Sequence, residues 1–251
     1  MSGHSHWATI KHKKAASDAK KGKIISKMIK QIFIVVRDGG PDPNSNPALR
    51  LLLQKARQAG VNKDNMDRAI ARASGQSVDG VQMEEVVYEA YAPGGAALII
   101  SCVTDNKNRT TPEVRSIIEK RGGKMATSGA VGWMFKRKGV LTVKTADVPE
   151  DKLMEVVLDA GAEDVETGGE FYTITTAPED KGKVESALEK AGIKTETAEI
   201  NQEAENKIQL EVDAARKVVT LMQELDDQDD VNNVYTNFEM TAELAAELAK
   251  G

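Results

Sequence analysis

The order of strands and helices is set by residues 140–200, which read VLTVKTADVPEDKLMEVVLDAGAEDVETGGEFYTITTAPEDKGKVESALEKAGIKTETAEI. Short runs rich in β-branched residues alternate there with two longer segments of helical periodicity, and glycine or proline lies near the boundaries. The pattern predicts strand, helix, strand, strand, helix and strand over 140–144, 149–160, 164–166, 170–176, 178–191 and 195–200. This is the split βαβ, or ferredoxin-like, order.

The segments on either side predict a second sheet whose parts are separated in the sequence. Residues 86–91 and 96–103 are typical of a hairpin, and a helix that contains Pro112 and a strand over 131–135 follow. That sheet lacks a second helix and an edge strand. The C-terminal segment predicts a short strand, a helix and a strand, over 207–210, 212–225 and 231–238.

We therefore expect residues 76–138 plus 203–251 to form one discontinuous α+β domain, with 139–202 inserted as a ferredoxin-like domain. The alternative is two consecutive domains, each with a poorly covered sheet. Residues 1–75 predict a basic helical domain with a flexible arm over 1–16. The expected fold class is α+β with three domains: an N-terminal helical bundle and two α/β-sandwich (ferredoxin-like) domains, one inserted in the other.

The N-terminal helices are indicated by spacing and by capping residues. Over 17–38 apolar residues recur at helical intervals, while Lys20, Lys23, Lys27 and Lys30 recur three or four apart on another face. Asn46 followed by proline predicts the start of a second helix, and Asn62 and Gly75 the two ends of a third.

Charge is distributed unevenly along a chain whose formal net charge is −5. Residues 1–75 carry 15 lysines and arginines against 5 acidic residues, and residues 76–251 carry 19 against 34. Within the latter, 139–202 carries 6 against 15. A basic segment joined to an acidic body is typical of proteins that bind polyanions. The alternative is a set of solvated charged faces.

Several motifs in the first 140 residues together resemble those of the YebC family. They are Gly3-His4-Ser5-His6-Trp7, Ile10-Lys11-His12-Lys13-Lys14, Gly39-Gly40-Pro41-Asp42-Pro43, Asn46-Pro47, Tyr88-Glu89-Ala90-Tyr91-Ala92-Pro93-Gly94-Gly95, residues 104–110, Arg121-Gly122-Gly123 and Trp133-Met134-Phe135. The resemblance implies three domains and a role in gene expression. That role is described as probable DNA-binding transcriptional regulation, or in other members as ribosome-associated translational activation.

The candidate nucleic-acid-binding residues are cations that can follow a phosphate backbone without reading bases. They are Lys11, Lys13, Lys14, Lys20, Lys21, Lys23, Lys27, Lys30, Arg50, Arg57, Lys107 and Arg109, which Arg68 and Arg72 could extend. Trp7 is a candidate for stacking on a base, or else a core aromatic.

Lys107 and Arg109 also lie at the start of a predicted helix, where backbone amides favour an anion. The alternative is a loop that caps its own helix through Thr110 or Thr111.

Other classes of function find little support in the sequence. His4, His6 and His12 have no cysteine beside them and no helical spacing, so we expect no metal site, and the lone Cys102 excludes an intramolecular disulfide. Nucleotide-binding and hydrolase motifs are missing, so we expect no enzyme and no cofactor, although paired-carboxylate chemistry stays open. With no membrane span and no secretory signal, a cytoplasmic monomer is expected.

The sequence therefore predicts a non-enzymatic nucleic-acid-binding regulator of gene expression. DNA and ribosomal RNA are both candidate targets, and the acidic domains could contact the ribosome or the transcription machinery. A third interpretation is a protein-interaction adaptor in which the acidic domains carry the function.

Overall fold

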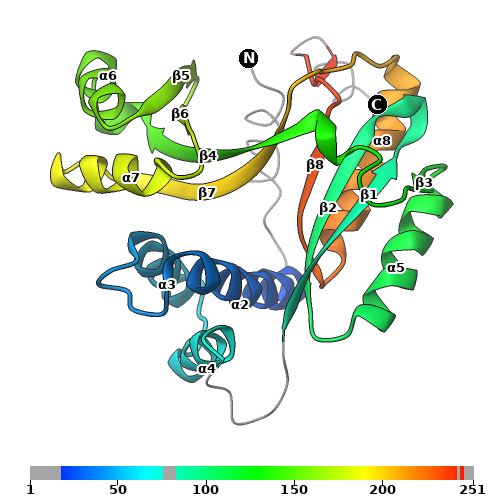
Figure 1. Cartoon of the computed structure of the whole chain (residues 1–251), viewed down its shortest axis with the longest axis horizontal. Coiled ribbons are helices and arrows are strands. Elements are labelled where there is room, and N and C mark those ends of the chain that lie inside the picture. The colour runs from blue at the N-terminus through cyan, green and yellow to red at the C-terminus, as the bar shows by residue number, and fades with distance from the viewer. Residues whose placement is uncertain (1–17, 76–82, 242–243, 246–251) are drawn as a thin grey trace.

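The computed structural model describes residues 18–75, 83–241 and 244–245, and it confirms the α+β class (Figure 1). Helices α2 (Asp18–Gly39), α3 (Pro47–Gln58) and α4 (Lys63–Ala73) form the N-terminal unit. Both α3 and α4 pack against α2, around a core that includes Ile32 and Met66. The helical N-terminal region expected from the spacing of apolar residues is therefore confirmed.

Asn46 fixes the turn between α2 and α3. Its side-chain oxygen accepts a hydrogen bond from the amide of Leu49 at 3.0 Å, and its amide nitrogen donates to the carbonyl oxygens of Val35 at 3.0 Å and Gly40 at 2.9 Å. A proline takes the first helical position, where no backbone donor is needed. The helix starts predicted at Asn46 and Asn62 are both confirmed.

A first antiparallel sheet has the strand order β3-β1-β2-β8. Its strands are β1 (Glu84–Tyr91), β2 (Ala97–Thr104), β3 (Lys124–Met125) and β8 (Val231–Thr236). Helices α5 (Lys107–Lys120) and α8 (Val212–Asp227) lie side by side and bury one face of it (Figure 1). The short helical turn η1 (Pro93–Gly95) joins β1 to β2, and Gly94 has a φ of 76° there.

The C-terminal segment contributes the edge strand of this sheet. β8 pairs antiparallel with β2 from Leu98 opposite Thr236 to Cys102 opposite Val231. The side chains of α8 share one apolar core with those of β1, β2 and α5. Whether the sheet folds as a domain independent of residues 139–202 stays a prediction.

The second antiparallel sheet has the order β5-β6-β4-β7. Its elements are β4 (Phe135–Lys144), η3 (Thr145–Asp147), α6 (Glu150–Asp159), β5 (Ala162–Gly168), β6 (Phe171–Thr176), α7 (Lys181–Lys190) and β7 (Thr195–Ala204). Both helices add to the core on one face of the sheet. The ferredoxin-like order predicted from residues 140–200 is confirmed.

A two-stranded ribbon connects the two sheets. β4 and β7 are already paired at Phe135 opposite Ala204, whereas β6 joins β4 only from Gly139 onward. Phe135 and Ala204 pack with Ile99 and Tyr235 on the face of the first sheet that α5 and α8 leave uncovered. The chain thus enters and leaves the second sheet along strands that are bonded to each other.

Two local expectations differ from the structure, which also contains one strand that the sequence analysis does not predict. The strand expected over 131–135 is wrong, because Gly132–Met134 forms the helical turn η2 and only Phe135 belongs to a strand. The short strand β3 was not expected, since two residues carry no periodic pattern. The strand expected over 207–210 is reduced to a single bridge between Ile208 and Phe238.

Removal of residues 139–202 tests the inserted-domain prediction. We expect a chain that joins Lys138 to Glu203 through a short Gly/Ser linker to keep a cooperative thermal transition by circular dichroism, because the two strand ends lie side by side at Lys138 opposite Asn201. Truncation after residue 202 should instead cause aggregation, because it removes α8 and β8 and exposes the core of the first sheet. A cooperative transition in the truncated chain, or none in the excised one, would overturn the prediction.

Candidate nucleic-acid interface

The lysines of α2 that the sequence singles out contact the end of α8. Lys23 Nζ donates to the carbonyl oxygen of Asp227 at 2.9 Å, and Lys27 Nζ donates to Asp226 Oδ1 at 2.8 Å and to the carbonyl oxygen of the same residue. The last carbonyl groups of a helix lack intrahelical partners and carry partial negative charge, so cations are favourable there. About two turns of the predicted cationic face therefore lie against the protein's own acidic segment.

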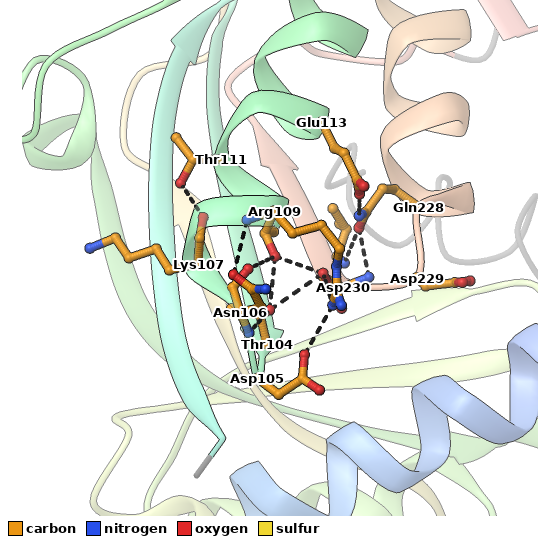
Figure 2. A network of polar contacts seen from close by, with 12 residues as sticks. Thr104, Asp105, Asn106, Lys107, Arg109, Thr111, Glu113, Gln228, Asp229 and Asp230 are labelled. Carbon is orange, nitrogen blue, oxygen red and sulfur yellow. Dashed lines mark hydrogen bonds and ion pairs between the residues drawn. The ribbon is translucent and has the colours of Figure 1, made fainter. Parts of the chain in front are cut away.

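Asp230 is the central acceptor of this contact (Figure 2). Its side chain, 4% exposed, accepts hydrogen bonds from Lys30 Nζ at 2.7 Å, Thr110 Oγ1 at 2.6 Å and Arg109 Nη2 at 3.0 Å. Burial raises the pKa of Asp230, but hydrogen bonds from Lys30, Thr110 and Arg109 outweigh it and hold the pKa at about 2. The carboxylate is therefore charged at neutral pH and joins α2 to α5.

The loop before α5 is organised by its own side chains (Figure 2). Asn106 caps the helix by accepting a hydrogen bond from the amide of Arg109 at 3.1 Å, and the amide of Asn106 donates to Thr104 Oγ1 at 2.9 Å. Thr110 donates to Asp230 and Thr111 to the carbonyl oxygen of Lys107, so neither is the cap that the sequence suggested. Arg109 also pairs with Asp105 at 3.0 Å.

The remaining described candidates fall into two groups. Arg50 Nη2 pairs with Glu189 Oε2 at 2.8 Å, which places α3 against α7, and Lys55 on the same helix donates to the carbonyl oxygen of Glu196. Arg57, Arg68 and Lys107 are exposed, as is Lys63, which the sequence analysis did not select. Within the described ranges, no ion pair involves any of these four.

Some predictions fall outside the described residues. These are the arm lysines Lys11, Lys13 and Lys14, the three histidines and Trp7; the side chains of Lys20 and Lys21 are also outside the description.

Among residues 18–75 and 83–241, no group of three histidine, cysteine or acidic residues is placed to hold a metal ion. None of the helices described there is both long and apolar enough to cross a membrane. Cys102 is buried, and burial raises its pKa to about 12.

Two models of one protein family match most of the chain. Residues 5–76 match the family model described as the TACO1/YebC protein N-terminal domain, and residues 83–238 match the one described as the TACO1/YebC second and third domain. The chain belongs to the TACO1/YebC family. The resemblance noted in the sequence motifs is thereby confirmed.

Several relatives within the TACO1/YebC family span the full length of the chain. A protein of Bifidobacterium animalis subsp. lactis is 48% identical, with 99% of each chain covered, and one of Brachyspira hyodysenteriae is 49% identical, with 98% of this chain and 100% of the relative covered. Both are named probable transcriptional regulatory proteins. The crystal structure of a conserved hypothetical protein from Aquifex aeolicus matches with a TM-score of 0.82 and 43% identity, covering 94% of this chain and 97% of that one.

The partners of the α2 lysines were missed by sequence reasoning. Four aspartates lie within Asp226–Asp230, directly after the amphipathic pattern of α8. Three lysines of α2 lie within residues 23–30, so the two segments are opposite in charge. The sequence contains both patterns, but only the tertiary structure shows that they face each other.

Replacement of Asp230 by asparagine tests the network. An amide cannot balance the charges of Lys30 and Arg109, so we expect Asp230→Asn to lower the free energy of unfolding by roughly 2–4 kcal/mol at pH 7. Because the folded-state pKa is depressed, the carboxylate's contribution is complete above the unfolded-state pKa and is lost as pH falls toward 2.

Urea unfolding measured between pH 7 and pH 2 should therefore show a flatter acid dependence in the variant than in the parent chain. Asp229→Asn is the matched control, because Asp229 is exposed and receives Lys30 through its backbone carbonyl, which the substitution keeps. Equal losses of stability in Asp229→Asn and Asp230→Asn would show that the Asp230 carboxylate is not the acceptor that matters.

Proposed function

We propose that this protein is a non-enzymatic regulator of gene expression that acts in the cytoplasm as a monomer and binds nucleic acid through residues 1–75. The observation that carries the proposal is the excess of 15 basic over 5 acidic residues in that segment of an otherwise acidic chain. Membership of a family whose relatives are named probable transcriptional regulatory proteins supports it.

The contacts are expected to be with phosphates rather than with base edges. α3 packs against α7 through Arg50 and Glu189, so one face of this helix is already occupied within the chain. On α4 the exposed Lys63 and Arg68 alternate with the exposed Asp64 and Asp67, which would lie close to the same phosphates. The available cations therefore favour binding that depends on charge and shape, with little sequence preference.

Duplex DNA and structured ribosomal RNA both offer such a phosphate surface. Residues 139–202, with 15 acidic against 6 basic residues, would be repelled by either and are suited to a basic protein surface of the ribosome or the transcription machinery. The two targets are separated by fractionating a lysate and asking whether the protein migrates with ribosomes or with chromosomal DNA. Migration with neither, together with no affinity for purified nucleic acid, would favour the protein-interaction adaptor instead.

Replacement of Lys11, Lys13 and Lys14 by alanine tests the ionic contact. Each phosphate contact releases condensed counterions, so the slope of log affinity against log salt should become shallower by about 1 for each lysine that touches a phosphate. Affinity should fall equally for unrelated sequences, while the thermal midpoint stays nearly unchanged. Fluorescence anisotropy at several salt concentrations measures the slope.

A matched control is Lys183→Ala, which removes an exposed lysine from the acidic second-sheet unit. It should leave both the affinity and the slope unchanged. An affinity of the parent chain that does not depend on salt would contradict the electrostatic proposal, and early unfolding of the triple variant would show that the arm belongs to a core.

A further inference from the structure

The turn η2 carries the most exposed large hydrophobic side chain among the described residues. Trp133 is 66% exposed, although tryptophan is usually highly buried on average. Tyr91, at the end of β1, is 38% exposed and lies nearby, because Tyr91 Oη and Trp133 Nε1 donate to the same carbonyl oxygen, that of Ala130, at 3.3 Å and 3.1 Å. We call Trp133 and Tyr91 the aromatic pair.

The loop that carries Trp133 is held by a buried carboxylate. Glu89, 9% exposed, accepts hydrogen bonds from the amides of Gly129 at 2.6 Å, Val131 at 2.6 Å and Gly132 at 2.8 Å. Burial raises the pKa of Glu89, but these backbone donors outweigh it and lower the pKa. A charged acceptor with three amide donors gives the loop one conformation, so the aromatic pair is ordered before any ligand arrives.

The other side of the loop is packed against the first sheet. Val131 and Phe135 share an apolar cluster with Ala97 and Ile99 of β2 and with Tyr235 of β8. Trp133 is not part of that cluster. Its exposure therefore does not follow from a poorly packed loop, because Val131 and Phe135, two residues away on either side, are buried.

The sequence around the aromatic pair is positively charged. Residues 120–146 contain seven lysines and arginines and no acidic residue. Lys124 lies opposite Tyr91 in the register of β1 and β3, which places both side chains on one face of the sheet. Arg137 on β4 is also exposed.

Acidic residues of other elements balance part of this charge. Arg121 pairs with Glu224, Lys136 with Glu205, Lys138 with Glu163 and Lys144 with Glu196. Lys120, Lys124 and Arg137 have no ion pair within the described ranges, and of these three Lys124 is placed beside Tyr91 by the strand register.

We propose that the aromatic pair, with Lys124, is a binding site for unpaired nucleotides of single-stranded nucleic acid. An exposed ring stacks on a nucleobase of any identity, and adjacent cations contact the flanking phosphates. The bases of a duplex are already stacked on one another and do not offer a free face to Trp133. The site deepens the proposed function and rests on it, because it adds a second nucleic-acid contact that lies outside residues 1–75.

An exposed tryptophan is also a frequent anchor in protein interfaces. The seven lysines and arginines over 120–146 favour the nucleic acid, since a basic segment attracts phosphates. Binding of a protein at this site is accordingly one of the outcomes that the experiment separates.

Two tryptophans make a spectroscopic test practical. In a Trp7→Phe chain, Trp133 is the sole tryptophan. Titration of this full-length variant with oligo(U) should quench its fluorescence, because a base stacks on the indole, whereas a duplex RNA of equal length should bind with little quenching. This readout does not depend on a variant that loses function.

Affinity provides the second measurement. Trp133→Leu should weaken oligo(U) binding on the order of tenfold, the effect expected for loss of one stacked base, and should leave duplex affinity unchanged. Trp133→Phe should restore most of the affinity. Leu158→Ala is the matched control, since Leu158 is a half-exposed apolar residue on α6 in the acidic second-sheet unit, and it should bind both probes like the parent chain.

The outcomes are distinguishable. Duplex binding that persists while Trp133 is neither quenched nor required for oligo(U) binding would overturn the single-strand site, leave the proposed function intact and assign the surface to a protein. Equal losses on both probes in Trp133→Leu would also overturn it. Binding of neither probe by the parent chain would overturn both the site and the proposed function.

Discussion

The buried carboxylate of Asp230 holds the N-terminal unit in its place. The apolar core of α2, α3 and α4 shares no residue with the core of the first sheet, so the two units are joined largely by polar contacts. Asp230 lies between them, directly before β8, and receives donors from α2 and α5. A buried carboxylate with these partners tolerates little displacement, because each lost donor leaves charge uncompensated. The position of α2 therefore depends on this side chain together with the contacts of Lys23 and Lys27 at the end of α8.

This arrangement changes what the charge segregation means. In the sequence, the excess of basic residues lies in 1–75 and the excess of acidic residues lies in 76–251, so the two charges look well separated. In the structure, Lys23, Lys27 and Lys30 face Asp226–Asp230, and Arg50 faces Glu189. Part of the positive charge is thus neutralised within the chain, so only the remaining cations are available for the proposed contact with phosphates. Charge patterning remains a guide to the class of ligand, while the residues that touch the ligand depend on which pairs have already formed.

The elements that sequence could predict are those with a local physical cause. Asn46 and Asn62 begin helices because their side chains satisfy free amides, and the strands and helices over 140–200 follow from periodicity. The turn at Gly132–Met134 could not be predicted in this way, because it depends on Glu89, some forty residues earlier in the chain. The Glu89 carboxylate accepts hydrogen bonds from the amides of Gly129, Val131 and Gly132. The Asp230 network depends likewise on residues from α2, α5 and the segment before β8. Trp133 was read as part of a family motif, and its exposure is visible only in three dimensions.

The ribbon formed by β4 and β7 gives the molecule a mechanical property. Two strands that are bonded to each other resist stretching along their length, whereas a two-stranded ribbon twists and bends more readily than a broad sheet. The second sheet is attached to the rest of the molecule at two places, along this ribbon and through the contact of α7 with α3. The ribbon ends at Phe135 and Ala204, which pack against β2 and β8, and Phe135 lies two residues from Trp133. A change in the angle of the ribbon would therefore be felt first beside the exposed indole.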